Sequence, residues 1–165
     1  MITFRGEPIT LEGTPVNEGE HAPDFYALDR EFKPVRLSDF KGQVVIISAV
    51  PSVDTTVCAA QTRRFNTEAA RHGIKTLTIS MDLPFAQSRF CTTEKINHAT
   101  LLSDFRDRDF AKRWGLRIEG MGLITRAVYV IGKDRTVVYR ELCADLGQEP
   151  NYEKAIEAAR EANEA

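Results

Sequence analysis

Val44-Val-Ile-Ile-Ser-Ala-Val50, followed directly by Pro51-Ser-Val-Asp-Thr55-Thr-Val-Cys58, is the stretch of sequence that decides the fold. Its first half is a continuous apolar run rich in β-branched residues, which is typical of a strand buried on both faces. Beyond it, Thr56 to Arg71 has the pattern of a helix, and Gly73 is a suitable residue to end that helix. This order predicts a buried strand that turns tightly into a helix.

Cys58 lies at the start of this predicted helix. Asp54 and Thr55 both belong to the residue types that cap helix N-termini, so the cysteine is expected in or near the first turn. There, unpaired backbone N–H groups and the positive end of the helix dipole favour an anion, and a thiol tends to become a thiolate. The arrangement indicates a nucleophile site, although the residues alone also allow Cys58 to be a small buried hydrophobe.

Further elements follow from the same kinds of pattern. We predict an N-terminal hairpin over Ile2–Leu11, a strand over Ile74–Ser80, short helices over Ala86–Phe90 and Phe105–Trp114, antiparallel strands over Leu123–Ile131 and Thr136–Cys143, and a terminal helix over Tyr152–Ala162. This order predicts an α/β fold. It resembles a thioredoxin-like fold, with a central mixed sheet flanked by helices, to which the N-terminal β-hairpin is an extension.

Length and composition limit the classes of protein that this chain can be. A chain of 165 residues suits a single domain, residues 1–165, with residues 1–16 as the hairpin extension. Its 22 basic and 24 acidic residues give a net charge of −2, which indicates neither a nucleic acid nor an anionic membrane as partner. No apolar stretch reaches the roughly 20 residues that span a bilayer. The N-terminus lacks the apolar core of a signal peptide, so we expect a cytoplasmic protein.

The three cysteines of the chain do not show the spacing of a metal site. In a reducing compartment they argue against a scaffold of structural disulfides, and catalytic, metal-binding or buried roles stay open. The sequence contains neither a C-x-x-C nor an H-x-x-x-H pattern that would gather metal ligands, so no metal is expected. Only His98 is a remote candidate for the base of a cysteine protease, and there is no glycine-rich phosphate loop.

Two motifs of the sequence resemble a known enzyme family. Pro51-x-x-x-Thr55-x-x-Cys58 matches the signature of the peroxiredoxins, which reduce hydroperoxides with a cysteine thiolate. Asp82-Leu-Pro-Phe-Ala-Gln-Ser-Arg-Phe-Cys91 closely resembles the segment that holds the second cysteine in the bacterial thiol peroxidases, an atypical two-cysteine branch of the peroxiredoxins. Phe65-Asn66 and Arg126–Ile131 also resemble this branch, and the likeness covers nearly the whole chain.

This resemblance implies a catalytic cycle for the chain. Cys58 would be the peroxidatic cysteine, whose thiolate takes one oxygen from hydrogen peroxide or an alkyl hydroperoxide and becomes a sulfenic acid. Cys91 would be the resolving cysteine, forming an intrachain Cys58–Cys91 disulfide that thioredoxin or a similar dithiol donor then reduces. The resemblance also implies a homodimer and no metal or bound organic cofactor.

The remaining site residues are implied in the same way. Pro51 would fix the turn and shield the site, and the Thr55 hydroxyl would face the thiolate or a bound peroxide. Arg126 matches the arginine that completes the site in the family, whereas the residues alone indicate a strand-end arginine facing water. Phe85 resembles part of the collar that accepts organic hydroperoxides, which suggests contact with substrate. Cys143 matches no functional position of the family, and we interpret it as a structural thiol.

The resemblance leaves the movement of the chain and a second function open. A disulfide needs Cα atoms within about 4.4–6.8 Å, so we expect one or both cysteine-bearing helices to unwind partly during turnover. Pro84 and Thr92-Thr93 make the Cys91 segment a weak helix. An alternative function is a peroxide-sensing switch or a chaperone-like protein that uses the same disulfide as a signal. A disulfide reductase on the same fold is disfavoured by the absence of C-x-x-C.

Overall fold

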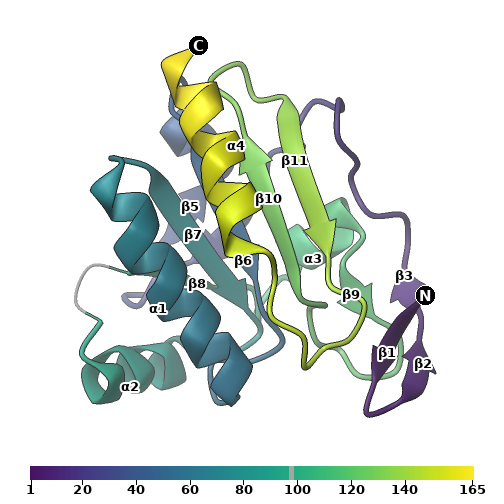
Figure 1. Cartoon of the computed structure of the whole chain (residues 1–165). Helices are drawn as coiled ribbons and strands as arrows, with labels where there is room; N and C mark the ends of the chain where they lie inside the picture. Colours follow the sequence, from purple (N-terminus) through teal and green to yellow (C-terminus); the bar gives the residue numbers. More distant parts are fainter. Residues whose placement is uncertain (97–98) are drawn as a thin grey trace.

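The computed structural model describes residues 1–96 and 99–165 and is organised around a seven-stranded mixed sheet (Figure 1). The strand order is β11-β10-β6-β7-β8-β4-β5. These strands are β4 (Tyr26–Leu28), β5 (Pro34–Arg36), β6 (Val45–Ala49), β7 (Lys75–Ser80), β8 (Thr100–Ser103), β10 (Ala127–Ile131) and β11 (Val137–Leu142). β6, β7 and β8 are parallel, whereas β10 and β4 run antiparallel to both of their neighbours. The predicted α/β fold with a central mixed sheet is confirmed.

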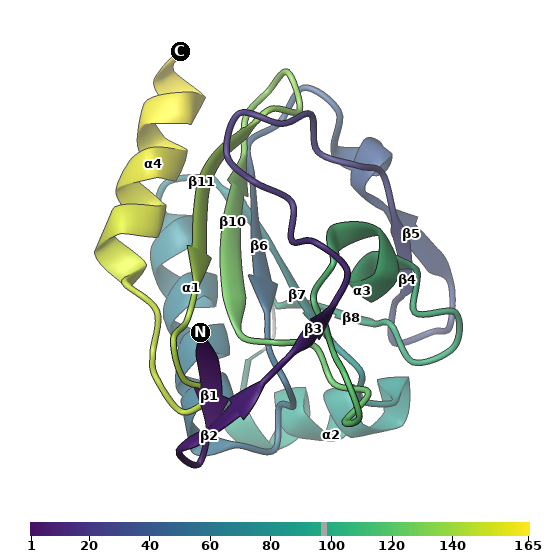
Figure 2. The ribbon, with the colours of Figure 1, turned by 90° about the vertical axis from the view of Figure 1, so that its right-hand side faces the viewer.

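The sheet is buried on both faces, as the apolar sequence of β6 predicts. Ile47 packs into the cluster that holds the aromatic residues of α3 (Asp109–Trp114), and Ile46 packs into the cluster shared by α1 (Thr56–Arg71) and α4 (Tyr152–Glu164). Neighbouring side chains of a strand point to opposite faces, so one strand contributes to both cores. Figures 1 and 2 show α1 and α4 side by side on one face of the sheet and α3 on the other.

Helix α1 begins and ends where its sequence predicts. Thr55 is the N-cap with extended backbone, and the chain leaves the helix at His72, after which Gly73 has a φ of 68°. A left-handed glycine at this point lets the chain reverse without steric strain. A short loop joins the end of β6 at Ala49 to the start of α1 at Thr56. The buried strand and this loop therefore fix where the helix starts.

Helix α2 (Pro84–Glu94) lies beside the N-terminal part of α1 and carries Cys91. Pro84 occupies the first turn, where the missing N–H is not needed. Lys95 has left-handed backbone and ends the helix. Among residues 1–96 and 99–165, no helix has both the length and the apolar character needed to cross a membrane.

The predicted N-terminal hairpin is present. In the described residues, four short strands lie outside the main sheet: β1 (Ile2–Phe4), β2 (Glu7–Ile9), β3 (Leu11–Glu12) and β9 (Arg117–Ile118). β1 pairs with β2, and β3 pairs with β9. Thr3 of the hairpin also binds the C-terminal part of the chain, because its N–H donates to the Ala144 carbonyl at 2.9 Å and its carbonyl accepts from the Leu146 N–H at 3.0 Å. The hairpin is therefore tied to the segment that follows β11.

The prediction of a helix from Phe105 is wrong, since α3 begins at Asp109. Arg108 has a φ of 54°, which interrupts a regular helix at this residue. The buried carboxylate of Asp104 then accepts hydrogen bonds from two backbone N–H groups in the first turn of α3, at 3.1 and 2.9 Å. Residues 105–108, which the sequence predicts as helix, instead form a turn that places the Asp104 carboxylate at the start of α3.

Two other boundaries also differ from the predictions. β10 begins at Ala127, because the predicted start at Leu123 belongs to a segment in which the Thr125 N–H donates to the Leu116 carbonyl. The short helix predicted over Ala86–Phe90 is longer in the structure and includes Cys91. The sequence patterns did not identify β4, β5 and β8, which are only three or four residues long.

Candidate active site

Cys58 lies in the first turn of α1, as predicted, and its side chain is fully buried. Its backbone N–H donates to the hydroxyl of the N-cap Thr55 at 3.1 Å. This bond satisfies one of the N–H groups that the start of a helix leaves unpaired. The sulfur is therefore held at the positive end of the helix dipole, on a backbone whose position is fixed by the cap.

Arg126 is the hydrogen-bond partner of the Cys58 sulfur. It lies immediately before β10, and its Nη2 donates to Cys58 Sγ at 3.0 Å. Its Nε donates to the Leu146 carbonyl at 2.9 Å, and its Nη1 donates to Gln61 Oε1, also at 2.9 Å. All three guanidinium nitrogens have an acceptor, so the orientation of the cation toward the sulfur is fixed.

Gln61 is a site residue that the sequence analysis missed. Its side chain is fully buried, accepts from Arg126, and donates from Nε2 to the Ser48 hydroxyl of β6 at 2.7 Å. It therefore connects the arginine to the central sheet. Gln61 follows Cys58 by three residues, which puts both side chains on the same face of the helix. A polar residue at that spacing on a face directed toward the sheet was the signal that could have identified it.

The charge of Arg126 has no carboxylate partner in the described parts of the chain. The side chain is 1% exposed, and none of the ion pairs found within residues 1–96 and 99–165 includes it. A buried cation costs several kcal/mol, by rough estimate, unless an anion compensates it. Two of its acceptors are neutral amide oxygens, and the third is the Cys58 sulfur. A thiolate at Cys58 would supply the missing negative charge.

Pro51 and Thr55 lie in the loop that joins β6 to α1. Pro51 is buried two residues after the end of β6, whereas Thr55 is exposed at the helix start. The Thr55 hydroxyl accepts from the Cys58 N–H and donates to the Ser52 carbonyl at 3.4 Å. The structure thus brings Arg126 to the sulfur of Cys58 and the Thr55 hydroxyl to the backbone N–H of Cys58, and it places Pro51 in the same loop.

Cys91 lies in a different helix from Cys58, and both are free thiols. Its side chain is 3% exposed and belongs to an apolar cluster, against which Ala59 of α1 packs. Burial raises the pKa of the Cys91 thiol above its ordinary value. The Cys91 thiol therefore loses its proton less readily in this conformation than an exposed thiol does.

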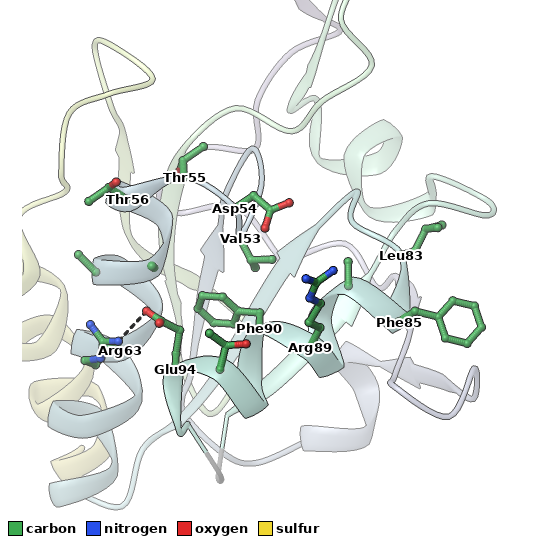
Figure 3. A pocket seen from close by; sticks show the side chains of 14 residues that line it. Val53, Asp54, Thr55, Thr56, Arg63, Leu83, Phe85, Arg89, Phe90 and Glu94 are labelled. Atoms are coloured by element: carbon green, nitrogen blue, oxygen red, sulfur yellow. Dashed lines mark hydrogen bonds and ion pairs between the residues drawn. The ribbon is translucent and has the colours of Figure 1, made fainter.

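An open pocket of about 900 Å³ lies between α1 and α2 (Figure 3). Phe85 lines it and is 72% exposed. The ring lies 5.2 Å from that of Phe32, centroid to centroid. On the opposite wall Arg63 of α1 pairs with Glu94 of α2 at 2.8 Å. The pocket has apolar and charged walls and includes Thr55, so it adjoins the start of the Cys58 helix.

The third cysteine has a different environment. Cys143 is 1% exposed, and burial raises the pKa of its thiol to about 12. Such a thiol is not reactive near neutral pH. Across residues 1–96 and 99–165 there is no group of three or more His, Cys, Asp or Glu side chains that is arranged to hold a metal ion. His98, the remote candidate for a protease base, lies outside the described residues.

The chain is similar to known proteins over most of its length. The model of the AhpC/TSA family matches residues 19–140. The chain is 51% identical to the thiol peroxidase of Halalkalibacterium halodurans over 162 residues, with 98% of each chain covered. It is 48% identical to the thiol peroxidase of Bacillus subtilis over 160 residues, with 96% of each covered.

Solved structures show the same relation. A peroxiredoxin-like protein from Aquifex aeolicus superposes with a TM-score of 0.90 at 36% identity, covering 98% of this chain and 96% of that one. The sequence likeness extends through both cysteine-bearing helices and the arginine strand, because it covers nearly the full length. The chain therefore belongs to the bacterial thiol peroxidases, peroxidase enzymes of the AhpC/TSA family.

Proposed function

We propose that the chain reduces hydrogen peroxide and alkyl hydroperoxides through a cycle of Cys58 and Cys91, with thioredoxin or a similar dithiol protein as electron donor. The observation that carries this proposal is the 3.0 Å hydrogen bond from Arg126 Nη2 to Cys58 Sγ. It holds a buried cation against a sulfur at the start of a helix, where negative charge on the sulfur is favoured. This is the environment that a nucleophilic thiolate needs.

In the first step the Cys58 thiolate attacks the terminal oxygen of the peroxide. An S–O bond forms as the O–O bond breaks, the sulfur is oxidised to a sulfenic acid, and the leaving oxygen takes a proton from water. Ionisation alone contributes little, because a free thiol is a few per cent thiolate at pH 7 and full ionisation gains roughly thirty-fold. Arg126 and the N–H groups of the helix start stabilise the charge that develops on the leaving oxygen. Thr55 orients the peroxide, and Pro51 shields the site.

In the second step the Cys91 sulfur attacks the sulfenic sulfur of Cys58. The S–S bond forms, the S–O bond breaks, and the hydroxyl leaves as water with the proton of the thiol. The burial of Cys91 opposes this step, so α2 unwinds partly before the sulfurs meet. Hydrogen exchange tests this: α2 amides are expected to exchange faster in the disulfide form. Equal protection of α2 in both redox forms contradicts the unwinding.

In the third step an external dithiol reduces the Cys58–Cys91 disulfide. Bulky peroxides enter through the pocket between α1 and α2, where Phe85 contacts their apolar part. The proposal includes a homodimer, which the resemblance to thiol peroxidases implies, and a cytoplasmic location. Light scattering of the reduced protein at micromolar concentration is expected to give twice the monomer mass, and a monomer mass contradicts the dimer.

The first experiment is peroxide-dependent NADPH oxidation with thioredoxin and its reductase. Wild type is expected to turn over many times, Cys58→Ser not at all, and Cys91→Ser to stop after the first oxidation. Cys143→Ser is the matched control, since it removes a buried thiol that has no role in the cycle. Consumption of about one equivalent of peroxide per chain by wild type, with every dithiol donor tried, indicates a sensor and contradicts the proposed cycle.

A further inference from the structure

The carboxylate of Asp82 is the acceptor of three hydrogen bonds in the loop that joins β7 to α2. One oxygen accepts from the Ser52 hydroxyl at 2.9 Å, and the other accepts from the Val53 N–H at 2.8 Å and the Ser80 hydroxyl at 2.6 Å. Its backbone carbonyl accepts from the Ser103 hydroxyl of β8. Asp82 is thus attached to the sheet by its backbone and to the Cys58 loop by its side chain.

On one side, these bonds lead to Cys58. Ser52 is held by Asp82, and its carbonyl accepts from both the N–H and the hydroxyl of Thr55, each at 3.4 Å. Thr55 in turn caps the helix by accepting from the Cys58 N–H. The carboxylate therefore fixes the backbone on which the cap of the Cys58 helix rests, without touching the sulfur itself.

On the other side, the same bonds lead to the helix of Cys91. The Ser80 hydroxyl, which donates to Asp82, accepts from Gln87 Nε2 at 3.2 Å. Gln87 is fully buried in α2, and the same nitrogen donates to the Leu102 carbonyl of β8 at 2.9 Å. Gln87, which lies one turn before Cys91 in α2, is thus connected to the Asp82 carboxylate through the Ser80 hydroxyl.

Val53 provides a second and separate connection. Its N–H is held by Asp82, and its side chain, 2% exposed, packs in the apolar cluster that contains Cys91 and Phe90. Cys91 cannot leave this cluster without disturbing the apolar packing that also includes Val53, whose backbone is fixed by the carboxylate. Asp82 therefore restrains both cysteine-bearing segments in the arrangement seen here.

We infer that Asp82 is a positioning residue that holds the Cys58 loop and the Cys91 helix in the peroxide-reactive arrangement and thereby slows formation of the Cys58–Cys91 disulfide. The inference rests on the proposed cycle. It gives the Asp82 carboxylate opposite effects on two steps. The carboxylate accelerates the reaction of Cys58 with peroxide, because the cap and the sulfur stay in position. It delays formation of the disulfide, because α2 must first separate from the loop that Asp82 holds. The lifetime of the sulfenic acid is set by this carboxylate.

The test measures both steps in a single turnover with hydrogen peroxide. Reduced protein is mixed with peroxide, quenched at set times and alkylated, and mass spectrometry then follows the loss of the Cys58 thiol and the appearance of the disulfide. Asp82→Ala removes all three acceptor contacts, and Asp82→Asn keeps one oxygen for the Val53 N–H. Ser52→Ala removes the hydroxyl that donates to Asp82 and accepts from the Asp54 N–H, but it keeps the Ser52 carbonyl that Thr55 binds. Asp134→Asn is the matched control, because that exposed carboxylate accepts a backbone N–H in the distant β10–β11 turn.

Because hydrogen bonds to a charged group are stronger than those between neutral groups, Asp82→Ala is expected to slow thiol loss roughly ten-fold or more. Disulfide formation is expected to become several-fold faster, with smaller changes in the same directions for Asp82→Asn and Ser52→Ala. If Asp82→Ala fails to fold, the two milder variants decide. Rates that fall together, or that stay within two-fold of the Asp134→Asn control, overturn the inference. Wild type that forms no Cys58–Cys91 disulfide overturns the proposed cycle itself, whatever the Asp82 variants do.

Discussion

Replacing Gln61 by leucine is expected to slow the reaction of Cys58 with peroxide, although Gln61 does not contact the sulfur. Leucine has a similar size but no acceptor, so Arg126 Nη1 loses the oxygen that now lies 2.9 Å away. The guanidinium is 1% exposed and has no access to water that could replace this acceptor. It can either stay in place with an unpaired N–H or turn away from the sulfur.

The structure sets the size of this effect. A hydrogen bond to a charged group contributes about 1.5–3 kcal/mol, and each 1.36 kcal/mol is ten-fold in rate. If Arg126 turns, the second-order rate constant with peroxide falls between roughly ten- and a hundred-fold. If it stays, the same free energy is lost from the stability of the fold. The loss of transition-state stabilisation and the loss of folding free energy are together expected to reach at least about 1.5 kcal/mol.

The assay is stopped-flow mixing with hydrogen peroxide, together with urea unfolding of the reduced protein. Ser48→Ala is the control, because it removes the Ser48 hydroxyl that Gln61 Nε2 donates to but leaves the bond to Arg126 intact. Its rate constant is expected to stay within two-fold of wild type. A Gln61→Leu protein with both an unchanged rate constant and an unchanged free energy of unfolding refutes the assignment of Gln61 as the support of Arg126.

Three further predictions concern groups outside this contact. Burial raises the pKa of Asp104 to about 6, so the folded state binds the proton of this carboxyl more tightly than the unfolded state does. The tighter proton binding stabilises the folded state fully below about pH 4, and this stabilisation is lost as the pH rises through about 6. Asp104→Asn is expected to remove a pH dependence of about 3 kcal/mol at most, measured by urea unfolding between pH 4 and 7, and an identical pH profile in both proteins contradicts this. Phe85→Ala is expected to raise KM for cumene hydroperoxide but not for hydrogen peroxide, and to change the free energy of unfolding by less than about 0.5 kcal/mol because the ring is 72% exposed; equal effects on both peroxides count against the substrate contact. Cys143→Ser is expected to keep the wild-type turnover rate in the coupled assay, and a large loss would give this buried thiol a role in the cycle.

The sequence predicts best what depends on local patterns. The apolar run of β6 and the capped start of α1 identify a buried strand, a turn and a helix, and together they place Cys58 correctly. A strand buried on both faces needs apolar residues at every position, and a helix start needs a capping side chain, so both leave a mark on consecutive residues. The position of Arg126 against Cys58 was implied only by resemblance, because no local pattern records a contact between residues 68 positions apart.

The parts that were missed depend on contacts between distant segments. Gln61 and Asp82 are ordinary polar residues in the sequence, and their importance comes from partners on other elements. The start of α3 was predicted too early because a left-handed Arg108 and a capping Asp104 replace the first turn. The edge strands β4 and β5 are too short to show an alternating pattern.

In the proposed cycle, the contacts of Arg126 also determine when Cys58 becomes reactive as the chain is made. The arginine follows Cys58 by 68 residues, and its Leu146 anchor follows it by another 20. That anchor is held in turn by Thr3, from the opposite end of the chain. Since a chain is synthesised from its N-terminus, a ribosome-bound chain exposes Cys58 long before the cation and its support exist. If Cys58 is the proposed peroxidatic cysteine, a nascent chain lacks the hydrogen bond from Arg126 to its sulfur, and that bond forms only when the two ends of the sequence have met.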